Sequence, residues 1–501
     1  MDLWILLPVL LPSMTGILML LSSFAGHVRM TKTGCVKEEN RRGIHLLTGL
    51  VLGISVVLAL AAAWTGDRSV TLFYLMENIP IVFSIDGVGK LFVTFVSIVW
   101  AAVGLYSFVY MEHEGEEKRF FGFYLLVYGI LVALDFAGNL VTMYLFYELM
   151  TLASMPLVLH NGSREAIMAA VKYLLYSMCG AYMGLFGIFF LYQYCDTLAF
   201  VPGGSLNLAL AGGNTGILMM AVFAMLIGFG AKAGMFPLHA WLPTAHPVAP
   251  SPASAVLSGI IVKSGVLGLI RVVYYVVGAE FLRGTWVQTA WMTLSLITVF
   301  MGSMLAFREP VLKKRLAYST VSQISYIVFG LSLMSPAGME GALLHTVFHA
   351  FIKSALFLTA GIFIYQCGKT REEELYGIGK QMPVALWCYT FASLALIGIP
   401  PASGFISKWY LAQGALGAEV GVFRWLGPVV LLLSALLTAG YLLPITLNGF
   451  FPGKHAVAVE KKEPNWKMLL PLIVLAGLAV LLGVFPNPLI EYVSRIAATL
   501  M

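Results

Sequence analysis

Apolar segments of about twenty residues recur along nearly the whole chain, and this pattern limits the possible folds more than any other sequence feature. A helix of about that length crosses a hydrocarbon core about 30 Å thick. Only 11% of the residues are charged, whereas soluble domains average about 25%. The sequence therefore predicts an all-α polytopic membrane protein.

Fourteen spans are expected. The first has no basic segment before it and no small-residue cleavage site after it, which indicates a retained helix rather than a signal peptide. The predicted spans are residues 3–25, 44–64, 89–111, 119–137, 139–160, 167–194, 215–236, 253–277, 286–307, 311–335, 340–367, 383–414, 424–451 and 467–490.

The distribution of lysine and arginine predicts the orientation. Of the 30 cations, 19 fall in the odd-numbered loops, six on the other side and five inside spans. Because positive residues stay on the cytoplasmic side, we expect a multi-pass protein of the cell (inner) membrane with both termini outside. Anionic lipid and this topology account for the net charge of +6 without nucleic acid.

Five charged residues lie deep within otherwise apolar spans. A charge at mid-membrane costs roughly 2.5 to 3.5 kcal/mol on insertion scales, so such residues usually face a protein interior or a hydrated path. Packing alone does not explain five of them. They are Glu148, Lys232, Lys263, Lys353 and Lys408.

Glu148 and Lys232 are predicted to be partners. At about 4 Å and an effective dielectric near 20, opposite charges attract by about 4 kcal/mol, so a change in one group alters the proton affinity of the other. The pair can then act as a gate. A static salt bridge between two helices is the alternative.

His345, His349 and Lys353 follow an i, i+4, i+8 spacing and are predicted to share one face of a helix. Imidazole titrates near neutral pH and both accepts and donates protons, so this stripe is suited to a proton relay. Histidines that only hydrogen-bond neighbouring helices are the alternative.

Four further residues have less certain roles. Lys172 lies near the start of its span and either joins the path or reaches water at the surface. His239 and His246 follow an interrupted span and are candidate proton-loading groups or loop-shaping residues; they make a poor metal site. Asp135 is either a helix-end polar residue or an exit-side group.

Two segments are interrupted in a related way. Residues 215–247 break at Pro237, and residues 383–414 break at Pro400-Pro401. Such pairs indicate inverted repeats around a mid-membrane ion site. We expect five-helix repeats from helices 4–8 and 9–13, with broken helices 7 and 12. The predicted units are 1–118 (helices 1–3), 119–277 (first repeat), 286–451 (second repeat) and 467–501 (helix 14).

Cofactor chemistry has no signature in this chain. The five cysteines include no C-x-x-C pair, which argues against an iron–sulfur cluster or a structural zinc site. Glycines 228, 230 and 234 lie within a span and lack nucleotide-loop spacing, so close helix packing explains them better. We expect no cofactor, no metal and no catalytic site in this chain.

Four strings resemble motifs of the antiporter-like subunits shared by respiratory complex I, Mrp cation/proton antiporters and membrane-bound hydrogenases. The resemblance extends from about residue 120 to residue 450. The strings are residues 228–259 (GFGAKAGMFPLHAWLPTAHPVAPSPASAVLSG), 307–323, 345–358 and 398–408.

The resemblance implies fourteen helices with two half-channels, and it implies roles for matching residues. Glu148 and Lys232 match the helix-5 glutamate and helix-7 lysine, and Lys263 matches the helix-8 lysine. The His345, His349 and Lys353 stripe matches the helix-11 relay. Lys408 matches the charged residue of helix 12; lysine here and the chain length look more like the Mrp D subunit and its hydrogenase relatives.

The expected function is ion translocation, of protons with Na⁺ exchange as an option, inside a redox-driven complex. Partners would be other membrane subunits, further antiporter-like subunits and a peripheral redox arm, together with lipid. Two alternatives stay open: a subunit of an Mrp-type antiporter without a redox partner, and a membrane scaffold that transports nothing.

Overall fold

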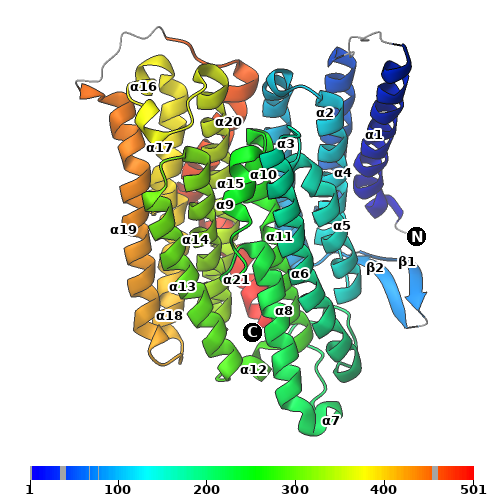
Figure 1. Cartoon of the computed structure of the whole chain (residues 1–501). Coiled ribbons are helices and arrows are strands. Elements are labelled where there is room, and N and C mark those ends of the chain that lie inside the picture. Colours follow the sequence, from blue (N-terminus) through cyan, green and yellow to red (C-terminus); the bar gives the residue numbers. More distant parts are fainter. Residues whose placement is uncertain (1–2, 34–40, 67, 77, 454–460) are drawn as a thin grey trace.

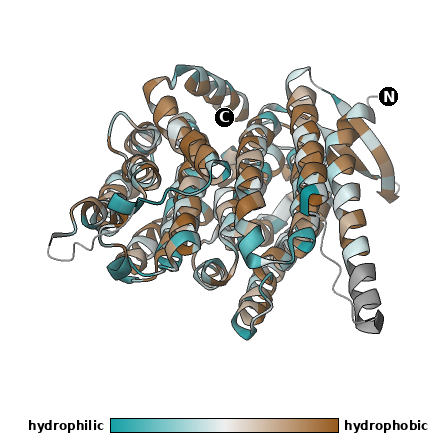
Figure 2. Cartoon of the chain, turned by 90° about the horizontal axis from the view of Figure 1, so that it is seen from above, coloured by the Kyte–Doolittle hydropathy of each residue, from teal (hydrophilic) through white to brown (hydrophobic). Residues whose placement is uncertain are grey.

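The computed structural model describes residues 3–33, 41–66, 68–76, 78–453 and 461–501. Long helices stand side by side, and a small β-hairpin projects from one flank (Figure 1). Viewed from above, hydrophobic residues cover much of the helices and hydrophilic residues gather near loops and helix ends (Figure 2). Eleven helices in the described part are long and apolar enough to cross a membrane.

The helices and strands follow the chain in the order shown in Figure 1. They are η1 (Leu3–Leu6), α1 (Leu7–Thr33), α2 (Arg41–Trp64), β1 (Ser69–Met76), β2 (Ile79–Ser84), α3 (Gly87–Glu114), α4 (Glu117–Asp135), α5 (Leu140–Val158), α6 (Arg164–Tyr194), α7 (Leu208–Ala211), η2 (Gly212–Asn214), α8 (Thr215–Ala233), α9 (Leu242–Val248), α10 (Ser251–Val256), η3 (Leu257–Ile261), α11 (Lys263–Ile270), η4 (Arg271–Val277), α12 (Ala279–Leu282), α13 (Trp286–Arg308), α14 (Leu312–Ser332), α15 (Pro336–Cys367), η5 (Glu372–Glu374), α16 (Ile378–Gln381), α17 (Pro383–Ile397), α18 (Ser403–Gly417), α19 (Phe423–Phe450), α20 (Trp466–Val484) and α21 (Asn487–Leu500).

Three of the fourteen predicted spans are not among the eleven. They correspond to α4, to α14 and to the interrupted pair α17 and α18. The first turns of α4 and α14 carry clusters of charged residues, and α17 alone is a shorter apolar helix. The number fourteen therefore stays a prediction.

Two spans form the centre of the bundle. In the most apolar stretch of Ser251–Val277 every residue is buried, and in that of Pro336–Cys367 94% of the residues are buried. In the corresponding stretches of the flanking spans Trp4–Ser23 and Trp466–Val484, only 33% of the residues are buried. A helix that is apolar on all sides belongs in such a core, so the polar residues of these two central spans are enclosed by protein.

Both predicted breaks are present, although one begins earlier than predicted. The first helix ends at Ala233 and Gly234 has a φ of 79°, so α8 stops before Pro237. The second break separates Ile397 from Ser403 and includes Pro400-Pro401, as predicted. Glycine readily adopts positive φ, which allows the chain to leave the first helix at that point.

The predicted helix over 253–277 is not uniform. Two π-helical stretches, η3 and η4, interrupt it on either side of α11. The predicted helix over 467–490 is also shorter than expected: α20 ends at Val484, and α21 is separate. The connection between the predicted spans 167–194 and 215–236 contains the short helices α7 and η2.

The hairpin of β1 and β2 was not predicted. Its strands are antiparallel, and β2 continues its pairing through Ser84 N–H to Phe136 C=O (2.8 Å) and Gly138 N–H to Val82 C=O (2.9 Å). Strand β1 therefore forms the edge, and most of its side chains are exposed.

The two ends of the described chain lie at the same end of the bundle. The Arg68 guanidinium lies 4.4 Å from the centre of the Trp4 ring, and Trp64 lines the same cavity as Arg495 of α21. This agrees with an even number of crossings. The first of the odd-numbered loops that hold most cations, from Arg29 to Arg42, lies partly outside the described residues.

Candidate functional site

Lys232 lies in the last turn of α8 and is fully buried. Its Nζ donates hydrogen bonds to Tyr173 OH (2.6 Å), Thr151 Oγ1 (2.9 Å) and Ser177 Oγ (3.3 Å). It also lies 4.4 Å from the centre of the Tyr173 ring. Hydroxyl groups from α5 and α6, rather than a carboxylate, therefore compensate this buried amine.

The expected direct ion pair between Glu148 and Lys232 is wrong. Glu148 is half-buried on α5, and its Oε1 accepts a hydrogen bond from Tyr144 OH at 2.9 Å. No ion pair links it to Lys232 among the described residues, although their charges interact at longer range. Thr151 lies three residues beyond Glu148 and contacts the amine in its place.

Lys263 occupies the junction between η3 and α11 and is buried. Its Nζ donates to Ser258 C=O at 2.8 Å and lies 2.6 Å from His349 Nδ1. A Cβ on Gly259 would lie 2.2 Å from Ser354 Oγ of α15, so this glycine permits the close approach of the two central spans. Helix packing therefore creates the Lys263–His349 contact.

The predicted stripe is present on α15, and all three side chains are buried. His345 Nδ1 lies 2.8 Å from Ser407 Oγ and its Nε2 lies 3.2 Å from Gln323 Oε1. The His345 and His349 rings are 6.0 Å apart between centroids. Lys353 Nζ donates to Leu316 C=O at 3.0 Å, so His349 contacts Lys263 rather than Lys353.

Lys408 follows the second helix break on α18 and is half-buried. Its Nζ donates to Leu396 C=O (2.7 Å) and Ile397 C=O (2.8 Å). These carbonyls belong to the last turn of α17, where a helix leaves acceptors unpaired and carries a partial negative charge. The break itself therefore supplies the oxygen atoms that bind Lys408.

Three of the four residues with less certain roles have no hydrogen bond to the lysines and histidines described above among the described residues. Lys172 is half-buried, 5.9 Å from the centre of the Tyr176 ring. His239 is half-buried between α8 and α9. His246 is fully buried and stacks on Phe357 at 4.6 Å; neither of its ring nitrogens has a hydrogen-bond partner among the described residues.

Four buried groups connect the central span Ser251–Val277, through α15, to α18 after the second break. Lys263 contacts His349, His349 faces His345, and His345 contacts Ser407, the residue before Lys408. Each member can donate or accept a hydrogen bond. His349 Nε2 and Gln323 Nε2 are buried without a described partner, and such atoms favour bound water.

The sequence reasoning missed the uncharged partners. Nothing in the sequence distinguishes Thr151, Tyr173, Ser177, Gln323 or Ser407 from other polar residues of membrane helices. A weak signal exists only for Ser407, which immediately precedes Lys408. The remaining partners become visible through contacts between helices that are distant in sequence.

A family model described as NADH:quinone oxidoreductase/Mrp antiporter, TM, matches residues 137–438. A second, described as NADH-Ubiquinone oxidoreductase (complex I), chain 5 N-terminus, matches residues 76–121. The first match covers more than half of the chain and includes all the predicted path residues.

Individual proteins of the same kind also match the chain. The chain is 30% identical to NADH-quinone oxidoreductase subunit N of Desulforudis audaxviator (strain MP104C), over 91% of this chain and 94% of that protein. It is 31% identical to Hydrogenase-4 component B of Escherichia coli (strain K12), over 82% of this chain and 63% of that protein. A chain in the structure of the Mrp complex from Dietzia sp. DQ12-45-1b matches with a TM-score of 0.83 and 22% identity, covering 100% of this chain and 98% of that one.

Membrane-spanning helices with two breaks and a buried row of lysine and histidine define an antiporter-like membrane subunit. The chain belongs to the family of membrane subunits found in NADH:quinone oxidoreductases and Mrp antiporters, as the sequence motifs predicted.

Proposed function

We propose that this chain translocates protons across the membrane as one subunit of a redox-driven complex of the hydrogenase or complex I type. The observation that carries the proposal is the buried row from Lys263 through His349 and His345 to Ser407 and Lys408. Buried amines and imidazoles are costly inside a membrane protein even when they are hydrogen-bonded, and proton transfer gives them a purpose. Lys232, with its hydroxyl partners, is the proton-holding group that interacts electrostatically with Glu148 in this scheme.

The proposal includes the finer architecture. Fourteen spans and two inverted repeats, 119–277 and 286–451, are supported by the paired breaks at α8/α9 and α17/α18, each beside a lysine. Both termini would face outside, which the distribution of loop cations supports. Electron transfer would occur in other chains, so no cofactor is assigned to this one.

Partner membrane subunits are part of the proposal. The relatives include a subunit of NADH-quinone oxidoreductase and a component of hydrogenase-4, and many apolar side chains are exposed on the flanks of α5 and α6. The edge strand β1 also exposes Phe73, Tyr74 and Met76. An open apolar edge of this kind favours pairing with another chain.

The test replaces the two residues at the start of the path. Glu148→Ala and Lys232→Ala should each abolish proton translocation in membrane vesicles that contain the complete complex. Glu165→Ala, an exposed carboxylate at the start of α6, is the matched control. Unchanged translocation in both path variants rejects the proposal, provided that immunoblots show normal amounts of the subunit.

The Mrp-type alternative, an antiporter without a redox partner, is favoured by the match to the Mrp complex over the whole chain. The subunits that copurify distinguish it: hydrogenase-like or NADH-dehydrogenase-like chains indicate the redox pump, and their absence indicates the antiporter. A scaffold without transport predicts that Lys408→Ala alters assembly but leaves ion flux unchanged.

A further inference from the structure

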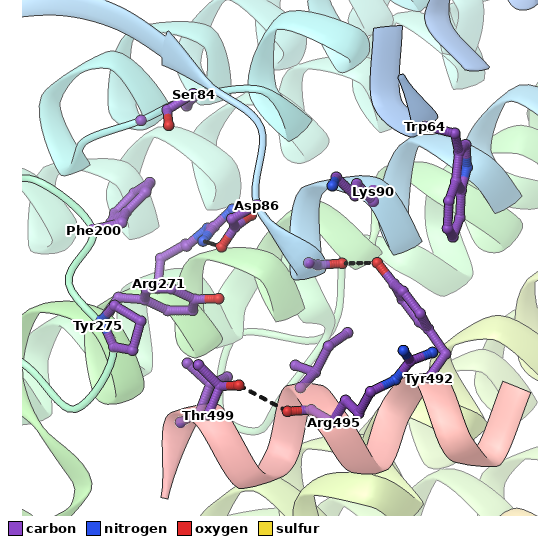
Figure 3. A pocket seen from close by; sticks show the side chains of 16 residues that line it. Trp64, Ser84, Asp86, Lys90, Phe200, Arg271, Tyr275, Tyr492, Arg495 and Thr499 are labelled. Atoms are coloured by element: carbon purple, nitrogen blue, oxygen red, sulfur yellow. Dashed lines mark hydrogen bonds and ion pairs between the residues drawn. The ribbon is translucent and has the colours of Figure 1, made fainter. Parts of the chain in front are cut away.

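A cavity of about 380 Å³ opens at the end of the bundle that holds both chain ends. Its walls come from the end of α2, the start of α3, the loops after α4 and α6, η4 and α21 (Figure 3). Tyr492 OH donates to Gly87 C=O at 2.9 Å and fixes α21 to the first turn of α3. Aromatic and charged side chains both line the cavity, so it offers apolar surface and charge at the same place.

This cavity concentrates positive charge on the side of the protein that has few cations. Six lysine and arginine residues fall on this side, against 19 on the other. Three of the six line the cavity and come from three elements: Lys90 from α3, Arg271 from η4 and Arg495 from α21. Asp86 is the one carboxylate among the described lining residues, since Asp135, at the end of α4, is buried and does not line the cavity. An excess of cations in a cavity favours an anionic occupant.

The two arginines are held differently. Arg271 is 1% exposed and donates two hydrogen bonds to Asp86, from Nη1 to Oδ2 (2.5 Å) and from Nη2 to Oδ1 (2.7 Å). The charge of Arg271 is therefore already compensated inside the protein. Arg495 is exposed; its Nε donates to Glu491 C=O on its own helix at 3.4 Å, and its guanidinium carbon lies 5.8 Å from the Tyr492 ring centre. The guanidinium of Arg495 can thus reach a ligand at the mouth of the cavity.

The cavity lies at the level where a membrane changes from hydrocarbon to head groups. Trp64 ends the span Arg41–Trp64, and Lys90 lies in the first turn of the span Gly87–Glu114. Trp64 and Tyr492, whose ring centres are 5.4 Å apart, both line the cavity, and tryptophan and tyrosine gather at membrane–water interfaces. A ligand in the cavity would therefore have its charge in the head-group layer.

A half-buried stripe leads along α3 from the cavity toward the middle of the membrane. Four residues follow Lys90 at intervals of three or four and so share one face of the helix: Thr94, Ile98, Ala102 and Leu105. The Trp64 indole donates to Thr94 Oγ1 at 3.1 Å and joins the stripe to the cavity. From Lys90 to Leu105 the helix rises about 22 Å, which exceeds half of a hydrocarbon core about 30 Å thick. The stripe is long enough for a lipid acyl chain.

We propose that the cavity and the stripe on α3 together bind one anionic phospholipid. Its phosphate accepts hydrogen bonds from Arg495 and lies near Lys90, and one acyl chain follows the stripe. A guanidinium presents two parallel N–H donors, a geometry that suits phosphate oxygens. This inference does not depend on proton translocation. Because the lipid contacts α3 and α21 only where the two are packed together, its binding stabilises the folded subunit.

The test uses the complete complex, purified in detergent after its native lipid has been removed by washing. The thermal aggregation temperature is measured as dioleoylphosphatidylglycerol, dioleoylphosphatidylcholine or inorganic phosphate is added. We expect phosphatidylglycerol to raise this temperature at concentrations at least about tenfold lower than phosphatidylcholine does, because only the former carries a net negative charge. Inorganic phosphate should have no effect, because it has no acyl chain to occupy the stripe.

Substitutions assign the effect to this cavity. Arg495→Gln should raise the concentration of phosphatidylglycerol that is needed at least about tenfold, because it removes the charge that pairs with the phosphate. Arg424→Gln is the matched control, because Arg424 is also exposed, belongs to the cation-poor side and lies 5.8 Å from the ring centre of its neighbour Trp425. Ala102→Trp fills the stripe without a change of charge and should also weaken the effect of phosphatidylglycerol.

The outcomes separate the possible occupants. Equal responses of Arg495→Gln and Arg424→Gln to phosphatidylglycerol overturn the site. Inorganic phosphate that protects as well as phosphatidylglycerol indicates a free-anion site and overturns the lipid, as does a wild-type response of Ala102→Trp. A crosslink from Arg495→Cys to another subunit of the complex would show that protein covers this face, and it would likewise overturn the proposal.

Discussion

Lys232 and Lys408 each lie beside a helix break, but different kinds of oxygen bind them. Three side-chain hydroxyls surround Lys232, whereas two main-chain carbonyls bind Lys408. Hydroxyls both donate and accept, so they can solvate an amine in either protonation state. Carbonyls only accept, so they stabilise the ammonium form.

The ends of the two broken helices explain the difference. At the end of α8, the carbonyl of Ala231 already accepts from Gly234 N–H and from the Trp241 indole at 2.9 Å, and that of Gly230 accepts from Met235 N–H. At the end of α17, both Gly398 N–H and Ile399 N–H bond to Leu394 C=O. The carbonyl oxygens of Leu396 and Ile397 therefore accept hydrogen bonds from Lys408 instead. We therefore expect the same sequence element, a lysine near a break, to titrate at Lys232 and to stay charged at Lys408.

The largest expected effect is the difference between the two lysines when each is replaced by arginine, which keeps the charge but cannot release a proton. Lys232→Arg should reduce proton translocation by at least about 100-fold, the loss expected for an essential acid–base group. Lys408→Arg should retain it within about threefold, because a guanidinium can donate to the same carbonyls.

Vesicle translocation, normalised to the amount of assembled complex, checks this pair. Equal losses in both variants would remove the distinction between a titrating and a fixed lysine. Lys408→Met supplies the control, because it leaves the carbonyls of α17 without a donor.

A smaller effect is expected from the hydroxyl shell. Tyr173→Phe removes a 2.6 Å hydrogen bond to Lys232 and the contact with Ser154 Oγ at 2.7 Å. Hydrogen bonds to charged groups contribute about 1.5–3 kcal/mol, so translocation should fall by roughly 10- to 100-fold. Tyr182→Phe, on the exposed face of α6, should not change it. A Tyr173→Phe variant as active as Tyr182→Phe would mean that the shell only fills space.

The smallest effect concerns the contact between Lys263 and His349, which links the two central spans. Gly259→Ala places a methyl group 2.2 Å from Ser354 Oγ and should separate Lys263 from His349. We expect a loss of about 1–3 kcal/mol in stability, as for other overpacked cores, visible as a lower thermal aggregation temperature in detergent.

Gly53→Ala is the matched control, because a Cβ there meets nothing within 4 Å. Ser354→Ala combined with Gly259→Ala should restore part of the stability. No rescue would show that the clash is not with this hydroxyl.

The amino-acid sequence by itself determined the membrane class, the approximate positions of most long helices and the family. Apolar length and periodicity are local properties, and Lys232, Lys263, His345, His349, Lys353 and Lys408 are conspicuous because charge is costly within such segments. The i, i+4, i+8 spacing correctly placed three of these residues on one helix, since it follows from helix geometry alone.

The tertiary structure alone decided the partners of these residues. Glu148 was expected to pair with Lys232, but Thr151, one turn further along α5, contacts the amine instead. The hairpin, the π-helical stretches and the pairing of Arg271 with Asp86, 185 residues apart, likewise depend on packing between distant segments. Charge identifies which side chains need compensation, whereas only the arrangement of the helices determines which oxygen or nitrogen atom provides it.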